Sequence, residues 1–168
     1  MPVMEPQIIE QAHRQAVRAS VPDVASYLQD LLSRRLVAYL AGVKDAKTVS
    51  RWANGEVKEV RQESEERLRL AYEIAQLLVH FDSPRIIKAW FIGLNPQLED
   101  ESPADVIREG RLKEAKAAAR AFATGGLRST LNRSARRGHS IPRSARLRSL
   151  RAPGLGLGQR RRNFHQPV

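Results

Sequence analysis

The segment SPRIIKAWFIGLNPQLEDESPADVIREG, residues 83–110, contains the start and stop signals of two short helices. Serine-proline pairs at 83–84 and 102–103 each place a capping hydroxyl before a proline at the first helical position. Gly93 and Gly110 follow where such helices would end. The Asn-Pro pair between them is stiff, because proline restricts its own φ and the residue before it. The segment therefore predicts two helices joined by a rigid corner.

Apolar and acidic side chains surround this Asn95-Pro96 corner. Trp90, Phe91 and Ile92 precede it, Leu98 follows it, and three consecutive acidic residues come next. A rigid corner beside an aromatic patch and an acidic run favours a surface for docking another protein. The alternative is a helix-corner-helix unit that only packs within its own fold.

The composition restricts the class of protein. The chain has 168 residues, enough for one domain and an appendage. It contains no cysteine, which fits a reducing compartment and excludes disulfides and cysteine metal sites. No apolar run approaches the roughly 18 residues of a membrane span, and the N-terminal residues lack the apolar region of a signal peptide. We expect a cytoplasmic protein with no membrane partner.

The net charge of +11 is confined to the C-terminal segment. Residues 127–168 contain eleven arginines, no lysine and no acidic residue. The rest of the chain holds the other 18 of the 29 basic residues and all 18 acidic ones, so it is neutral overall. A neutral body argues against a large basic face on the folded part.

Residues 127–168 are predicted to form a disordered basic tail. They have few large apolar side chains to offset an ordering cost of about 1–2 kcal/mol per residue. An arginine-rich tail would bind DNA or RNA without sequence preference. A reading-frame slip past the natural terminus is an alternative origin, because the residue usage resembles nothing upstream.

A second pattern lies upstream. Helices are predicted at 34–41, capped by Ser33 and ended by Gly42, and at 46–53, capped by Asp45. Two short helices joined by a turn with glycine form the helix-turn-helix pattern. The candidate DNA-binding residues are of the types that contact phosphates and base edges: Lys44, Lys47, Thr48, Ser50, Arg51 and Asn54. The turn is one residue longer than usual, so a hairpin that only packs is the alternative.

The remaining periodicity completes an all-α fold. Further helices are predicted at 6–18, at 24–32 with Asp23 as N-cap, and at 111–124. The longest predicted helix, 61–81, is apolar over most of its girth, which is typical of a helix buried between two layers. Its polar residues form one narrow stripe: Arg69, Glu73, Gln76 and His80.

This long helix is predicted to join the helix-turn-helix to the small helical unit at 83–110. We expect His80 to be a surface residue of its polar stripe rather than a catalytic residue. The predicted divisions of the chain are residues 1–60, 61–126 and 127–168.

Together the two patterns resemble the Xre/MbcA/ParS-type antitoxins of bacterial type II toxin–antitoxin systems. LVAYLAGVKDAKTVSRWANGE at 36–56 is similar to their helix-turn-helix, including a W-x-N-G-E ending. AWFIGLNPQLEDESPADVIREG at 89–110 is similar to their C-terminal toxin-binding domain, in which a Trp, an N-P, a Leu, an S-P and a Gly recur. The likeness covers roughly residues 20–126.

The resemblance implies an antitoxin that binds a toxin encoded beside it, often a RES-domain enzyme that destroys NAD. Such antitoxins cover the active site of the toxin, and the complex represses its own promoter. Operator DNA is then a second partner, and we expect a homodimer within a toxin–antitoxin hetero-oligomer. The expected toxin-binding residues are Phe91, Asn95, Pro96, Leu98, Arg111, Lys113 and Arg120, with the three cations as candidates to enter the NAD-phosphate site.

An enzyme is not expected. The four histidines lack metal-ligand spacing, and the chain has no cysteine nucleophile, no P-loop and no G-x-G-x-x-G after a strand. We therefore expect no catalytic residue, metal or cofactor. The alternative function is a free-standing DNA-binding transcriptional regulator with a basic nucleic-acid-binding tail.

Overall fold

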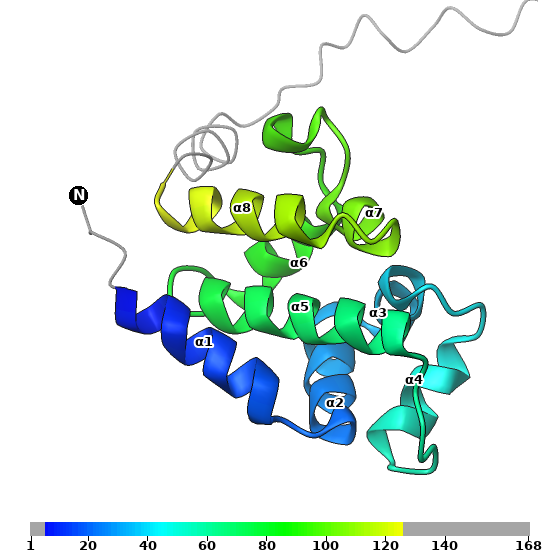
Figure 1. The fold of residues 1–168 in the computed structure, drawn as a ribbon. Coiled ribbons are helices and arrows are strands. Elements are labelled where there is room, and N and C mark those ends of the chain that lie inside the picture. The colour runs from blue at the N-terminus through cyan, green and yellow to red at the C-terminus, as the bar shows by residue number, and fades with distance from the viewer. Residues whose placement is uncertain (1–5, 126–168) are drawn as a thin grey trace, which may run out of the picture.

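The computed structural model describes residues 6–125, which form an all-α fold (Figure 1). Every helix predicted from the sequence is present within a few residues of its predicted ends, and this range contains no strand. The predicted tail, residues 127–168, lies outside the described residues. The elements are α1 (Pro6–Arg18), α2 (Val21–Leu32), α3 (Arg34–Ala41), α4 (Ala46–Ala53), α5 (Gln62–Leu78), α6 (Pro84–Ile92), the 3-10 turn η1 (Pro96–Leu98), α7 (Pro103–Arg108) and α8 (Leu112–Ala123).

Helices α2, α3 and α4 pack on one another, and α3 and α4 have the predicted bounds. Gly42 ends α3 in the left-handed region, at φ 78°, and the Val43 N–H donates back to the Ala38 carbonyl (3.0 Å). These are the features of a Schellman cap. The Asp45 carboxylate then accepts from the Lys47 N–H (2.8 Å) and caps α4. The long turn therefore leads from one capped helix end directly into another.

The start of α2 differs from the prediction. Ser20, not Asp23, is the N-cap, and α2 begins at Val21. Ser20 Oγ accepts from the Asp23 N–H (3.3 Å) and donates to the Asp23 carboxylate (2.5 Å). The serine therefore caps α2 through its hydroxyl, and the cap tolerates Pro22 because the first turn of a helix leaves N–H groups unpaired anyway. The sequence analysis placed the N-cap three residues too late, because Ser20-Val21-Pro22 was interpreted as a break between helices although Ser20 begins α2.

Helix α5 is the centre of the fold, as the prediction of a helix between two layers requires. It contacts α1 and α2 on one side and α8 on the other, and it also touches α3 (Figure 1). Leu68, Ile74 and Leu78 are almost fully buried. Glu73, from the predicted polar stripe, is only 8% exposed, because α1 and α8 supply polar partners that cover it.

Residues 83–110 form α6, η1 and α7, as their start and stop signals predict. Ser102 caps α7 by accepting from the Asp105 N–H (3.1 Å), whereas Ser83 makes no side-chain cap bond. Helix α8 packs against α5, α7 and η1 and covers this unit. One cluster of buried apolar side chains includes Trp52 of α4 and Phe91 of α6, so the core crosses the predicted boundary between residues 60 and 61.

Candidate functional site

Most of the predicted DNA-binding residues lie on the outer side of α4. The exposed members of the set are Lys44, Lys47, Arg51 and Asn54. Thr48 and Ser50 are half-buried, and Ser50 Oγ accepts from Arg34 Nη1 (3.3 Å), so Ser50 faces α3. The apolar side of α4 is buried against α2 and α3. The structure therefore brings four of the six residues onto one accessible surface.

A carboxylate that the sequence analysis did not single out modifies this surface. Glu56 Oε2 lies 3.7 Å from Arg51 Nε, and Glu56 Oε1 accepts from Asn54 Nδ2 (3.0 Å). Gly55, at φ 71°, turns the chain back so that the Glu56 N–H donates to the Arg51 carbonyl (2.9 Å). The W-x-N-G-E ending is thus a helix cap that holds a carboxylate against two candidate DNA-binding side chains.

Asn95 organises the corner between α6 and α7. Its N–H donates to the Glu101 carbonyl (3.1 Å), and its own carbonyl accepts from the N–H groups of Leu98 (2.8 Å) and Asp100 (3.0 Å). Its side-chain Oδ1 accepts from the Gln97 N–H (3.0 Å), while its Nδ2 is buried with no hydrogen-bond partner among residues 6–125. Asn95 is 2% exposed, so it shapes the corner from inside the fold.

The backbone of the corner is strained next to Asn95. Glu99 (φ 56°) and Asp100 (φ 64°) both lie in the left-handed region, which residues other than glycine seldom occupy. The two residues are exposed, and their conformation brings Asn95 and Glu101 together in an isolated antiparallel bridge. Strained backbone of this kind is concentrated at binding and switch sites.

The accessible apolar surface of the corner is not formed by all the residues that the sequence predicted. Leu94 is 78% exposed and Ile92 is 58% exposed, and Pro96 is also exposed. Phe91 and Leu98 are buried, so in this conformation they support the surface from behind and do not face a partner. The expected toxin-binding residues omitted Leu94 and, although it was placed beside the corner, Ile92, because an apolar run does not reveal which side chains meet the core.

Trp90 lies beneath the corner. Its ring packs edge-on against Phe91 (centroids 5.2 Å apart) and tilted against Phe122 of α8 (6.1 Å). The indole Nε1 is buried and has no hydrogen-bond partner among the described residues. Buried donors are almost always paired in folded proteins. Trp90 and Asn95 therefore place two unpaired donors in the same unit.

Arg111, a predicted toxin-binding cation, is already engaged within the chain. Its guanidinium pairs with Glu114 (2.6 Å), Glu101 (2.7 Å) and Glu109 (3.3 Å). Glu114, followed by Glu101 and Glu109, holds the pKa of Arg111 above its ordinary value. Arg111 in turn holds the pKa of the Glu114 carboxyl below its usual range. Arg111 thus joins the corner to the start of α8 and is not a free cation.

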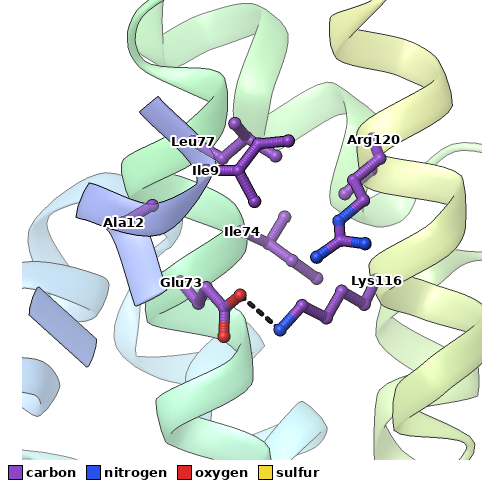
Figure 2. Close-up of a pocket in the computed structure, with 8 residues that line it drawn as sticks. Ile9, Ala12, Glu73, Ile74, Leu77, Lys116 and Arg120 are labelled. Carbon is purple, nitrogen blue, oxygen red and sulfur yellow. Dashed lines mark ion pairs between the residues drawn. The ribbon is translucent and has the colours of Figure 1, made fainter. Parts of the chain in front are cut away.

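Helices α1, α5 and α8 meet at a second ionic cluster around Glu73, and Figure 2 shows its Glu73–Lys116 pair. Lys116 Nζ lies 2.5 Å from Glu73 Oε1, and His13 Nδ1 lies 3.1 Å from Glu73 Oε2. The hollow beside them measures about 10 Å³, room for roughly one water molecule. Arg120 lines its rim and is exposed, as is Lys113. The cluster joins three helices and is too small to hold a cofactor.

Tyr39 connects α3 to α7. Its hydroxyl donates to Asp105 Oδ1 (2.5 Å), and the Arg108 guanidinium carbon lies 4.4 Å from the centre of its ring. Hydrogen bonds from Ser102 and then from Tyr39 hold the pKa of the Asp105 carboxyl below its usual value. The bond to Asp105 raises the pKa of Tyr39. The helix-turn-helix and the α6–α8 unit are therefore linked by polar contacts as well as by the core.

Within residues 6–125, no group of histidine and acidic side chains is arranged to hold a metal ion. No helix of this range combines the length and the apolar character that crossing a bilayer requires. Comparison of the chain with family models, with curated proteins and with solved structures found no match. A functional assignment therefore depends on the geometry described above and on the sequence resemblance.

Proposed function

We propose that this protein is an antitoxin. It binds a cognate toxin, an NAD-degrading enzyme of the RES type, and neutralises the toxin by covering its active site. With the toxin, it represses its own operon through α3 and α4. It acts in the cytoplasm as a binding protein rather than an enzyme, as a homodimer within a toxin–antitoxin hetero-oligomer.

The observation that carries this proposal is the exposed corner between α6 and α7. Ile92 ends α6, and Leu94 lies two residues later at the start of a loop that Asn95 fixes with four hydrogen bonds. A single exposed leucine is ordinary, but two exposed large apolar side chains beside a strained, rigid loop favour a protein-binding site. A rigid loop also loses little conformational entropy when a partner binds.

Two basic side chains of α8 support contact with an active site that binds NAD. Lys113 and Arg120 are exposed and form no ion pair with any described residue. Free cations can pair with phosphate oxygens, whereas the three carboxylates around Arg111 already satisfy it. We therefore assign the phosphate contact to Lys113 and Arg120 and give Arg111 a structural role.

The exposed side of α4 supports the DNA-binding half of the proposal. It presents Lys47 and Arg51 one turn apart, on a helix that α2 and α3 hold in place. In helix-turn-helix proteins the second helix enters the major groove and contacts base edges. Both helix ends at the longer turn are capped, which supports a fixed position of α4 next to α3.

The test is capture of the product of the adjacent gene by the full chain, read by native mass spectrometry and by growth of cells that express that product. Leu94→Asp should weaken capture by roughly 30-fold, the loss of about 2 kcal/mol expected at a hot spot. Val17→Asp is the matched control, because Val17 is 63% exposed on α1, away from the corner. Equal capture by both variants would contradict docking at the corner.

The same experiment separates the antitoxin from the alternative function. A free-standing regulator with a basic tail would show no complex with the neighbouring product and no rescue of growth. It would bind DNA through α4 and the arginines of residues 127–168. The exposed cations of α4 favour this alternative only if the corner has no partner.

A further inference from the structure

An open hollow of about 510 Å³ lies where α3, the turn before α4 and α7 meet. Arg35, Lys44 and Arg108 contribute its charged lining, and no acidic side chain lines it. The rest of the lining is Ala38, Tyr39, Val43 and Ala46. All three cations are exposed and form no ion pair within residues 6–125. Three unpaired cations therefore converge on one concave surface.

Arg108 is held in place before any ligand binds. Its guanidinium lies over the Tyr39 ring, 4.4 Å from the centroid, and Nη1 donates to the Tyr39 carbonyl (3.2 Å). One of its N–H groups is used in this way, and the others remain available. A guanidinium fixed by stacking loses little rotamer entropy on binding and presents planar donors that suit a phosphate.

The acidic residues nearest to the hollow along the chain are engaged elsewhere. Asp45 caps α4 through the Lys47 N–H. Asp105 accepts from the hydroxyls of Tyr39 and Ser102. Glu109, next to Arg108, pairs with Arg111 across 3.3 Å. These carboxylates keep their charge, and Asp105 interacts electrostatically with Arg108, but none of them lines the hollow, whose charged lining consists of the three cations alone.

We infer that this hollow binds a backbone phosphate of duplex DNA, so that the DNA-binding surface extends from α4 onto α7. The N-terminal end of a recognition helix lies closest to the base edges, and the hollow adjoins that end of α4 through Lys44 and Ala46. Side chains beside a groove meet the phosphates that border it. The inference rests on the proposed DNA binding, and it assigns Arg35 and Arg108 as phosphate contacts that position the protein without reading sequence.

The test measures the affinity of the full chain for a labelled duplex from the region directly upstream of its own gene, and for a scrambled duplex, over a series of salt concentrations. Arg108→Gln and Arg35→Gln should each reduce the slope of log affinity against log salt concentration by about one. Each should weaken binding to both duplexes equally. Arg35→Gln leaves the Tyr39 contacts intact, so its effect is not a folding effect. Arg14→Gln is the matched control, because Arg14 is exposed on α1, and α1 and α7 lie on opposite sides of α5 (Figure 1).

The other outcomes separate the two proposals. Unchanged salt slopes for Arg108→Gln and Arg35→Gln, together with weaker and less selective binding by Arg51→Gln, would overturn the phosphate site alone. No effect of any of the three substitutions would overturn DNA binding by α4 as well. If inorganic phosphate shifts the Arg108 Nε–Hε NMR signal while the duplex does not, the hollow binds free anions and the assignment to DNA is wrong.

Discussion

Trp90 gives the sharpest test of how the α6–α8 unit is built. The side chain is 5% exposed and contacts two phenylalanine rings, yet its Nε1 is buried with no partner among the described residues. Trp90→Ala removes the packing and no hydrogen bond. The expected loss of unfolding free energy is about 3–5 kcal/mol, as for other large buried aromatics.

Trp90→Phe should behave differently. The smaller ring leaves a cavity, and at about 24 cal/mol per Å³ a cavity of roughly 40 Å³ costs about 1 kcal/mol. Removing a buried, unpaired N–H raises the unfolding free energy by about 1–3 kcal/mol. We therefore expect the unfolding free energy of Trp90→Phe to equal that of the unsubstituted protein or to exceed it by up to about 2 kcal/mol.

The assay is urea unfolding of the full chain followed by far-UV circular dichroism, which reports the helices directly. Phe122→Leu, a change in the facing side chain that leaves the indole in place, is the control for loss of aromatic packing. A loss for Trp90→Phe as large as that for Trp90→Ala would refute the reasoning, since it would mean that Nε1 has a partner. If Trp90→Phe is as stable as the unsubstituted protein but no longer captures the toxin, Nε1 forms a hydrogen bond in the complex.

Three further changes test other parts of the fold and surface. Gly42→Ala should cost at least about 1–2 kcal/mol, because φ is +78° and a Cβ would lie 2.5 Å from a guanidinium nitrogen of α5; an unchanged melting temperature would contradict the strained turn. The pKa of the Asp105 carboxyl is depressed, chiefly by its bond with Ser102, so its stabilisation is present above the unfolded pKa and is lost as pH falls through the folded pKa. Asp105→Asn should therefore flatten the decline in stability measured below about pH 4, and an unaltered decline would exclude this carboxyl as its source. Glu56→Gln should tighten duplex binding by removing the negative charge beside Arg51, and weaker binding in the anisotropy assay would indicate that Glu56 positions Arg51 for DNA.

The sequence was most informative where one residue type has one backbone role. Glycine after an apolar run and serine before proline located the ends of α3, α6 and α7 to within about a residue. Apolar residues cover most of the circumference of the helix predicted at 61–81, and this correctly predicted a buried central helix. These signals are local, so they can be interpreted without knowing which residues are tertiary neighbours.

The placement of functional side chains depended on those neighbours. Phe91 and Leu98 looked like surface candidates because they flank the corner, but α8 and η1 close over the interior of that unit. Glu73 belonged to a polar stripe, yet Lys116 reaches it from a helix that begins 39 residues later in the sequence. Arg111 was predicted to contact a toxin although Glu109 and Glu114 lie close to it in the sequence, and its third partner, Glu101, reaches it only when the corner folds. No periodicity within one helix contains this information.

The sharing of α5 between the two halves of the fold has an evolutionary consequence. Because α5 packs on α2 and α3 as well as on α7 and α8, a recombination event between residues 60 and 61 would give a chimera whose α5 fits only one half. Lineages of this fold should therefore change their exposed surfaces through point substitutions on α4 and at the corner. Regulators with flexible linkers can exchange whole domains, but here such an exchange would be selected against because the chimera would fold poorly.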